Sequence, residues 1–373
     1  EDGDLVIAAP FPQRGYGPTR GHIVEIVGRQ EDPRAASLLA IAGHDIPTDF
    51  PEAVTEKIAT EIKLKRLAGP FPSPPHPHFK SSPLAIRHKE NGKIRLLHNL
   101  SYPYDQKSVN YNISEQDSTV KYATFHDAIK LIQLLDYDVY LAKSDIADAF
   151  RIIPLHPSQY HLTGFHWNGM YYFDKCLPMG CSSSCQIFEK FSDSLVWILK
   201  HHYQVSNVVK VLDDFLFIER SREQCLASLA KFSHLCKEIG VPIALHKTVG
   251  PSKRLTFLGI EIDIAARVAR LPHEKLVSYL NDVTTFLHKN STTLKELQSL
   301  VGKLSFATTI IPAGRCFLRR LHDRTIGITK PYHFVRVDKE VTSDLLMWKE
   351  FLRNYNGIST IVRRNYEFIK LVF

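Results

Sequence analysis

Three aspartates are the residues of this sequence that are best suited to chemistry. Asp213 and Asp214 are adjacent within the apolar, β-prone run of residues 210–219, and Asp145 lies near the end of an earlier strand-like segment. An ionised carboxylate pair must be solvated, hydrogen-bonded or bound to metal, because burying unpaired charge is costly. Such oxygens suit Mg²⁺, and two ions can activate an attacking hydroxyl and stabilise the leaving oxygens of a phosphoryl transfer. The spacing alone also fits a metal-dependent nuclease.

The adjacent pair has a simpler interpretation as well. Asp is a common turn residue, so Asp213 and Asp214 taken alone would more often mark an exposed tight turn than a metal site. The rest of the sequence has to decide between the two interpretations.

A basic hairpin is predicted before the aspartates. Two β-like runs flank Asn91-Gly92, a dipeptide that is typical of tight hairpin turns. Guanidinium and ammonium groups can neutralise a triphosphate, while a solvated hairpin tip would carry the same residues. The residues alone leave both interpretations open. The cations around this turn are Arg87, Lys89, Lys93 and Arg95.

The composition is that of a soluble chain with a basic surplus. The 373 residues suffice for two or three subdomains, and 44% of them are hydrophobic. The formal charge of +8 and the pI of about 9.0 favour a polyanionic partner such as nucleic acid. There is no apolar run of about 18 residues, no signal-like start and no CxxC pair. We therefore expect an intracellular protein of the cytoplasm or nucleus, with reduced thiols and no membrane contact.

The elements that must position these side chains mix helices and strands, so we predict an α+β fold. Thr293 and Glu296 form a capping box, and Ser343 is the expected N-cap of the last helix. The proline-rich residues 70–77 should be extended. Apolar spacing predicts helices at residues 52–67, 125–135, 186–199, 222–239, 273–289, 294–308, 313–322 and 344–352. β-prone runs predict strands or hairpins at residues 82–98, 139–146, 164–173, 210–219, 255–271 and 366–373.

Ordered motifs over residues 52–355 resemble the palm of reverse transcriptases. The wording is most similar to tyrosine-recombinase (DIRS-like) retrotransposons, as in "AGPFPSPP", "STVKYATFHDAI", "YYFDKCLPMGCSSSCQIFEKFS" and "LQSLVGKLSFATTIIPAGRCFLRRL". This order makes the simple turn interpretation of the aspartate pair much less favourable. The palm-like motifs are Asp145-Ile-Ala-Asp-Ala-Phe150, Leu177-Pro-Met-Gly180, Val211-Leu-Asp-Asp-Phe215, Leu245-His-Lys247 and Phe257-Leu-Gly259.

The resemblance implies a right-hand polymerase fold with fingers, a palm built on an antiparallel sheet, and a helical thumb. Residues 1–50 match no recognised pattern and are expected to be peripheral or disordered. Residues 366–373 look like the first strand of an incomplete RNase H-like domain, so we expect neither RNase H nor recombinase activity. The implied boundaries are fingers 51–124, palm 125–263, thumb 264–330, and connection with the RNase H start 331–373.

The resemblance also implies roles at the catalytic centre. Asp145, Asp213 and Asp214, with the backbone carbonyl of Ile146, would hold two Mg²⁺ ions, with Mn²⁺ as an alternative. Lys247 would lie near the departing pyrophosphate.

The incoming nucleotide would be bound by other residues of the motifs. Arg95, with Lys89 or Lys93, would hold the triphosphate. Phe150 would exclude a 2′-hydroxyl and so select deoxyribonucleotides. Gly180 would allow close approach to the nascent base pair.

Two further regions would contact nucleic acid. Phe257, Leu258 and Gly259 would form the grip under the primer strand, and a basic helical region would contact the nucleic-acid backbone, unless it is only a solvated face. The sequence departs from the common pattern at Leu212, Met179 and Cys185, which leaves the metal site intact. The basic residues are Lys303, Arg315, Arg319, Arg320 and Arg324.

The function implied is RNA-directed DNA polymerisation: dNTPs are added to a primer 3′-hydroxyl on an RNA or DNA template. The first alternative is a catalytically silent, retroelement-derived fragment that binds nucleic acid. The second is an RNA-templated RNA polymerase, against which Phe150 argues. A nuclease is the weakest alternative, because it leaves the fingers and thumb without a purpose.

Overall fold

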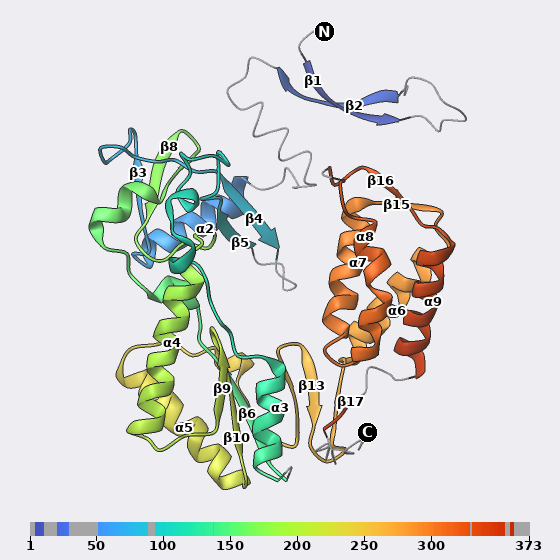
Figure 1. The fold of residues 1–373 in the computed structure, drawn as a ribbon. Helices are drawn as coiled ribbons and strands as arrows, with labels where there is room; N and C mark the ends of the chain where they lie inside the picture. Colours follow the sequence, from blue (N-terminus) through green and yellow to red (C-terminus); the bar gives the residue numbers. More distant parts are fainter. Residues whose placement is uncertain are drawn as a thin grey trace, which may run out of the picture. The chain divides into compact units, whose positions relative to one another are not determined.

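The computed structural model describes residues 4–10, 21–29, 51–88, 94–136, 138–328, 330–354 and 359–361. The chain divides into two compact units (Figure 1). Unit 1 contains residues 1–118 and 150–184, and unit 2 contains residues 119–149 and 185–373. Each unit is therefore assembled from two separate stretches of the sequence.

Unit 1 packs a helix, α2 (Pro51–Lys63), against short antiparallel strands. The predicted apolar stripe is confirmed: Val54 and Ile58 are buried and share a core with Phe165. The helix ends earlier than predicted, because Lys65 adopts a positive φ of 60° and the chain then enters a strand. The strands are β1 (Asp4–Pro10), β2 (Gly21–Arg29), β3 (Leu67–Phe71), β4 (Leu84–His88), β5 (Ile94–His98), β7 (Gly164–Trp167) and β8 (Met170–Asp174).

Two of the predicted hairpins lie in unit 1. Strands β7 and β8 join at Asn168-Gly169, where φ is 48° and 77°, as the favoured two-residue hairpin turn requires. Strands β4 and β5 pair antiparallel, but their turn at Asn91-Gly92 lies outside the described residues. Residues 1–50, predicted to be peripheral or disordered, contain the antiparallel pair β1–β2.

Unit 2 contains a four-stranded antiparallel sheet in the order β11–β6–β10–β9. Phe215 and Phe217 on β10 pack against Phe232 of one helix, while Leu216 and Ile218 share a core cluster with a second helix. Both faces are therefore covered, which explains the continuous apolar run around the aspartates. The strands are β6 (Tyr140–Asp145), β9 (Val208–Val211), β10 (Asp214–Glu219) and β11 (Val249–Ser252). The helices are α3 (Phe125–Leu134), α4 (Ser184–His201) and α5 (Arg222–Glu238).

A second sheet of unit 2 corrects one prediction. The run at residues 255–271 predicts a single hairpin with residues 255–263 as its first arm, but this arm is itself two strands, because the chain reverses at Leu258-Gly259, where φ is 47° and 74°. Gly259 tolerates this left-handed conformation at no steric cost. The strands follow the order β12 (Arg254–Phe257), β13 (Ile260–Asp263), β14 (Val268–Arg270) and β17 (Ser359–Thr360).

The remainder of unit 2 is mostly helical, in the orange and red part of Figure 1. The predicted capping box is present, since Thr293 and Glu296 exchange hydrogen bonds at the start of α7. Helix α9 begins before the predicted Ser343, because Asp338 accepts the N–H of Val341. The elements are α6 (His273–Leu287), β15 (Ser291–Thr293), α7 (Leu294–Ala307), α8 (Arg319–Asp323), β16 (Phe334–Arg336) and α9 (Lys339–Asn354).

Two further expectations concern the last third of the chain. Residues 313–322, predicted as one helix, form a 3₁₀ helix at Pro312–Phe317 and then the short α8. The predicted strand at residues 366–373 lies outside the described residues.

The thiols are unpaired, as predicted. All six cysteines are free, and burial raises the pKa of Cys225 and of Cys236 to about 12, so both are chemically quiet. Among the described residues, no helix has the length and apolarity needed to cross a membrane.

Candidate active site

The three aspartates come together at one end of the β6–β10 pair. Asp145 closes β6 and is the direct register partner of Asp214, which opens β10. Asp213 lies in the turn between β9 and β10, and its carbonyl accepts the N–H of Ile146 at 3.0 Å. The backbone of Asp145 is fixed as well, since its carbonyl accepts the N–H of Ala244 at 2.8 Å. The sheet register thus groups the side chains that the sequence singled out.

The cluster is electrostatically strained. Burial, followed by the charges of Asp145 and Asp213, raises the pKa of Asp214 to about 6. Lys247 offsets part of this charge, because its Nζ lies 2.9 and 2.8 Å from the two carboxylate oxygens of Asp145. Although burial opposes its charge, the pKa of Lys247 is raised by Asp145, Asp213 and Asp214. The site therefore has a strong preference for an added positive charge.

The donor set fits a hard divalent cation. Within the described residues, no three His, Cys, Asp or Glu side chains are already arranged around a single ion position. Asp145 nevertheless holds a cationic group, the Lys247 ammonium, with both of its oxygens. Carboxylates of this kind bind Mg²⁺ together with water and substrate phosphates, so a complete protein cage is not required.

The turn that carries Asp213 agrees with both interpretations of the aspartate pair, as a tight turn and as part of a metal site. Leu212 has a positive φ of 52°, and Val211 and Asp214 pair directly, so the aspartates do stand at a tight turn. The same turn directs them to Asp145. A turn and a candidate metal site are therefore the same feature here.

Unit 1 contains the predicted nucleotide-binding residues, except Lys89 and Lys93, which lie outside the described residues. Arg95 is exposed on β5 and lies directly across from exposed Arg87 on β4. Like charges in such a cross-strand pair are unfavourable unless an anion joins them.

Gly180 has a structural requirement that the sequence did not predict. Its φ is 119°, and a Cβ there would lie 1.9 Å from the carbonyl oxygen of His98. The close approach that excludes a side chain is thus an internal contact of unit 1. Asn110 completes this contact, because its Nδ2 donates to the Gly180 carbonyl at 2.8 Å.

Phe150 is half-buried and lies in a 3₁₀ helix, Ala149–Ile152. Ion pairs that the sequence did not predict fix this short helix through its neighbouring residue, Arg151. The Arg151 guanidinium contacts Asp174 at 2.5 Å and Glu61 at 3.2 Å. His98 Nδ1 lies 3.3 Å from the second oxygen of Asp174. The sequence feature that could have indicated this ion network is the single charged residue, Arg151, between the apolar residues Phe150 and Ile152.

Of the three residues predicted to form the primer grip, Phe257, Leu258 and Gly259, only the last two are accessible at the surface. Phe257 is 2% exposed and belongs to the core of unit 2, so its side chain cannot contact a primer strand. Leu258 and Gly259 are half-buried in the turn, where the Gly259 carbonyl accepts a hydrogen bond from Lys275 at 3.2 Å.

The basic residues of the helical region divide into two groups. Lys303 and Arg320 are neutralised in ion pairs with Asp282 at 2.6 Å and Asp344 at 3.4 Å. Arg315 is exposed, and Arg319 is 87% exposed with Asp323 3.9 Å away. Only the second group offers readily available positive charge.

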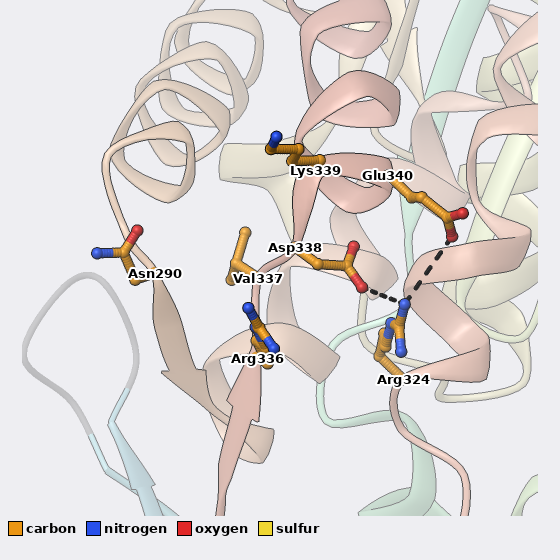
Figure 2. Close-up of a pocket in the computed structure, with 7 residues that line it drawn as sticks. All are labelled: Asn290, Arg324, Arg336, Val337, Asp338, Lys339 and Glu340. Carbon is orange, nitrogen blue, oxygen red and sulfur yellow. Dashed lines mark hydrogen bonds and ion pairs between the residues drawn. The ribbon is translucent and has the colours of Figure 1, made fainter.

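Arg324 lines a surface groove of about 630 Å³ on unit 2 (Figure 2). Its guanidinium forms ion pairs with Asp338 and Glu340, drawn as dashed lines in Figure 2. The groove also contains Arg336 and Lys339. Because Arg324 is already paired, it adds little to a nucleic-acid-binding surface.

The chain is similar to known proteins in sequence. The family model described as "Reverse transcriptase (RNA-dependent DNA polymerase)" matches residues 87–262. The Pro-Pol polyprotein of feline foamy virus is 27% identical over 229 residues, which are 60% of this chain and 19% of the polyprotein. The Gag-Pro-Pol polyprotein of Human T-cell leukemia virus 3 (strain Pyl43) is 24% identical over 279 residues, 73% of this chain and 17% of that polyprotein. The chain thus spans less than a fifth of these relatives.

Solved structures establish the fold. The foamy viral protease-reverse transcriptase dRH in complex with ds DNA has a TM-score of 0.65 at 20% identity, covering 98% of this chain and 53% of that one. The foamy viral protease-reverse transcriptase in complex with an RNA/DNA hybrid has a TM-score of 0.59 at 19% identity, covering 83% of this chain and 37% of that one. The α+β right-hand polymerase fold is confirmed. The segment that matches the reverse transcriptase model, residues 87–262, includes all three aspartates.

Proposed function

We propose that this chain is an RNA-directed DNA polymerase that adds dNTPs to a primer 3′-hydroxyl on an RNA or DNA template. One observation carries the proposal: Asp145 faces Asp214, with Asp213 in the adjoining turn, inside the segment that matches reverse transcriptases. We also assign the domain to the DIRS-like branch of retroelements, because of the motif wording over residues 52–355.

At the reacting phosphate, the carboxylates would bind the metal ions and Lys247 would bind the leaving group. Two Mg²⁺ ions, or Mn²⁺ in their place, held by the three aspartates and the Ile146 carbonyl, would lower the pKa of the primer hydroxyl and stabilise the leaving oxygens. Lys247 neutralises Asp145 in the free protein, at 2.8 Å. With substrate bound, its ammonium would donate to the departing pyrophosphate.

Unit 1 would bind and select the nucleotide. The facing pair Arg87 and Arg95 carries two positive charges on one face of a hairpin, which suits the triphosphate. Phe150 would fill the space of a 2′-hydroxyl, and Arg151 fixes its short helix to Asp174 and Glu61. A rigid ring in this place favours dNTPs over rNTPs.

Nucleic-acid binding is supported by the relatives and by exposed residues of unit 2. The named complexes of the foamy viral enzyme contain ds DNA and an RNA/DNA hybrid. On this chain the candidate contacts are Leu258, Gly259, Arg315 and Arg319. Lys303 and Arg320 contribute less, because each has an acidic partner. No observation specifically favours a catalytically silent binder.

Primer extension on RNA and DNA templates tests the proposal. Asp213→Asn should lower dNTP incorporation at least about 10³-fold in Mg²⁺, because the metal site loses a charged ligand. Asp138→Asn is the matched control, since Asp138 is 93% exposed and pairs only with Lys253 among the ion pairs of the described residues. Equal product from wild type and Asp213→Asn would overturn the proposal.

The remaining alternatives have their own readouts in the same assay. Tight nucleic-acid binding by the wild type without dNTP incorporation would identify the silent fragment. Efficient rNTP incorporation by the wild type would identify an RNA polymerase, and Phe150→Ala should then have no effect on the dNTP-to-rNTP ratio.

A further inference from the structure

The turn between β9 and β10 is held from one side by helix α4. The N–H of Leu212 donates to Glu189 Oε2 at 2.9 Å, and Ser192 Oγ donates to the Leu212 carbonyl at 2.8 Å. Glu189 and Ser192 are three residues apart on α4 and so lie on the same face. Both polar backbone groups of Leu212 are therefore bound by a single rigid element.

Glu189 is itself fixed by a buried ion pair. Lys210 Nζ lies 2.7 Å from Glu189 Oε1, 3.0 Å from the Glu189 carbonyl oxygen and 2.9 Å from Asp193 Oδ1. The side chains of Lys210 and Glu189 are 7% and 9% exposed. Buried ion pairs of this kind add little net stability compared with apolar residues of similar volume, so stability alone does not account for this one.

Leu212 needs such support because of its backbone. Its φ of 52° lies in the left-handed region, which a leucine rarely adopts unless the surroundings determine it. The next residue, Asp213, is bonded through its carbonyl to Ile146, and Asp214 then faces Asp145. A relaxation at Leu212 would therefore change the spacing of the carboxylates.

We propose that Glu189, Lys210 and Ser192 form a positioning cluster that fixes the Leu212 peptide groups and thereby sets the distance between the β10 aspartates and Asp145. Glu189 touches no substrate and acts only through Leu212. Lys210 holds the Glu189 carboxylate in the orientation that presents Oε2 to the Leu212 N–H. The kinetic consequence rests on the proposed polymerase function, while the effect on the turn does not.

Two double variants separate positioning from stability. Glu189→Gln with Lys210→Met removes the buried charges but retains an oxygen that can accept the Leu212 N–H. Glu189→Leu with Lys210→Met also removes the charges but leaves the Leu212 N–H without an acceptor. Neither leaves a lone buried charge, so both should fold, and thermal unfolding checks this.

The kinetic readout compares kcat with the KM for dNTP. The Leu/Met variant should lose about 10²-fold in kcat with KM nearly unchanged, because a shift of about 1 Å in a reacting group has this effect. The Gln/Met variant should stay within about threefold of wild type. Equal kcat values for the two folded variants would overturn the proposal.

Hydrogen exchange gives a readout that does not need activity. Amides of residues 208–219 should exchange faster in the Leu/Met variant than in the Gln/Met variant, while those of α7, which lies outside this sheet, should not change. If the wild type incorporates no dNTP, the proposed function fails, and this exchange comparison still decides on the positioning cluster. Equal exchange in the two variants would overturn it.

Discussion

Asp145 lies directly across the antiparallel β6–β10 pair from Asp214, and Lys247 holds both oxygens of the Asp145 carboxylate. Facing carboxylates repel each other, so this part of the fold is less stable by itself than with a cation present. The ammonium of Lys247 relieves part of that repulsion. The stability of the metal-free protein should therefore depend on pH and on these three side chains.

Asp214→Asn should stabilise the metal-free protein near pH 7.5 but not at pH 4. The pKa of Asp214 is raised to about 6 from the ordinary 3.8, so the folded state binds the proton more tightly than the unfolded state between these values. The free energy of unfolding therefore falls as pH rises through this window, and the amide removes that loss. We expect a gain on the order of 1 kcal/mol after solvent screening, measured by urea unfolding with a chelator. A gain that is the same at both pH values would contradict this explanation.

Lys247→Met should strengthen the binding of Mn²⁺ to the protein without nucleotide. The Lys247 ammonium competes for Asp145, so its removal should raise the affinity about three- to tenfold, measured by calorimetry. Primer extension should fall in the same variant, since the pyrophosphate loses a donor. Lys253→Met is the control, because Lys253 pairs with the exposed Asp138. Unchanged metal affinity in Lys247→Met would show that the ion pair does not compete with metal.

Gly180→Ala should destabilise the protein by about 2 kcal/mol or more, since the new Cβ would meet the His98 carbonyl at 1.9 Å with φ at 119°. Gly302→Ala is a matched substitution in α7, where a Cβ meets nothing within 4 Å. It should stabilise by about 0.5–1 kcal/mol through helix propensity. Denaturant unfolding of both variants checks the pair. Equal effects would mean that the Gly180 contact is not rigid.

Thr293→Ala should cost about 1 kcal/mol of stability, because the N–H of Glu296 loses its acceptor at the start of α7. Thr285→Ala serves as the control, since Thr285 is exposed and its hydroxyl only bonds the carbonyl of Asn281 within α6. Thermal unfolding of the two variants is the measurement. An equal loss of stability in Thr285→Ala would show that the capping box does not account for the effect of Thr293→Ala.

Features encoded by neighbouring residues were predictable from the sequence. The turn at Asn168-Gly169 and the capping box of Thr293 and Glu296 depend on residues at most three apart, and both are present. The aspartate pair could be assigned only in part. Its turn geometry is local, but its proximity to Asp145 depends on sheet register and was predictable only through the resemblance.

Features that depend on tertiary contacts could not be predicted. Arg151 pairs with Glu61 and Asp174, and Lys210 with Glu189, across stretches that no local pattern connects. Phe257 was assigned to the primer grip because Phe257-Leu-Gly259 resembles a reverse-transcriptase motif, yet its own ring belongs to the core. Burial of one residue within a functional motif is decided by packing, which the motif does not encode.

The discontinuous make-up of unit 1 affects how the protein emerges from the ribosome. Strand β3 is synthesised early, but its partner β8 follows only after the whole of β6 in unit 2 has been made. The apolar stripe of α2, which packs with Phe165 of β7, has to wait for the same stretch. Until the stretch that ends at residue 184 has left the ribosome, this stripe has no apolar partner from β7, and such transiently exposed surface is where nascent chains bind chaperones or aggregate.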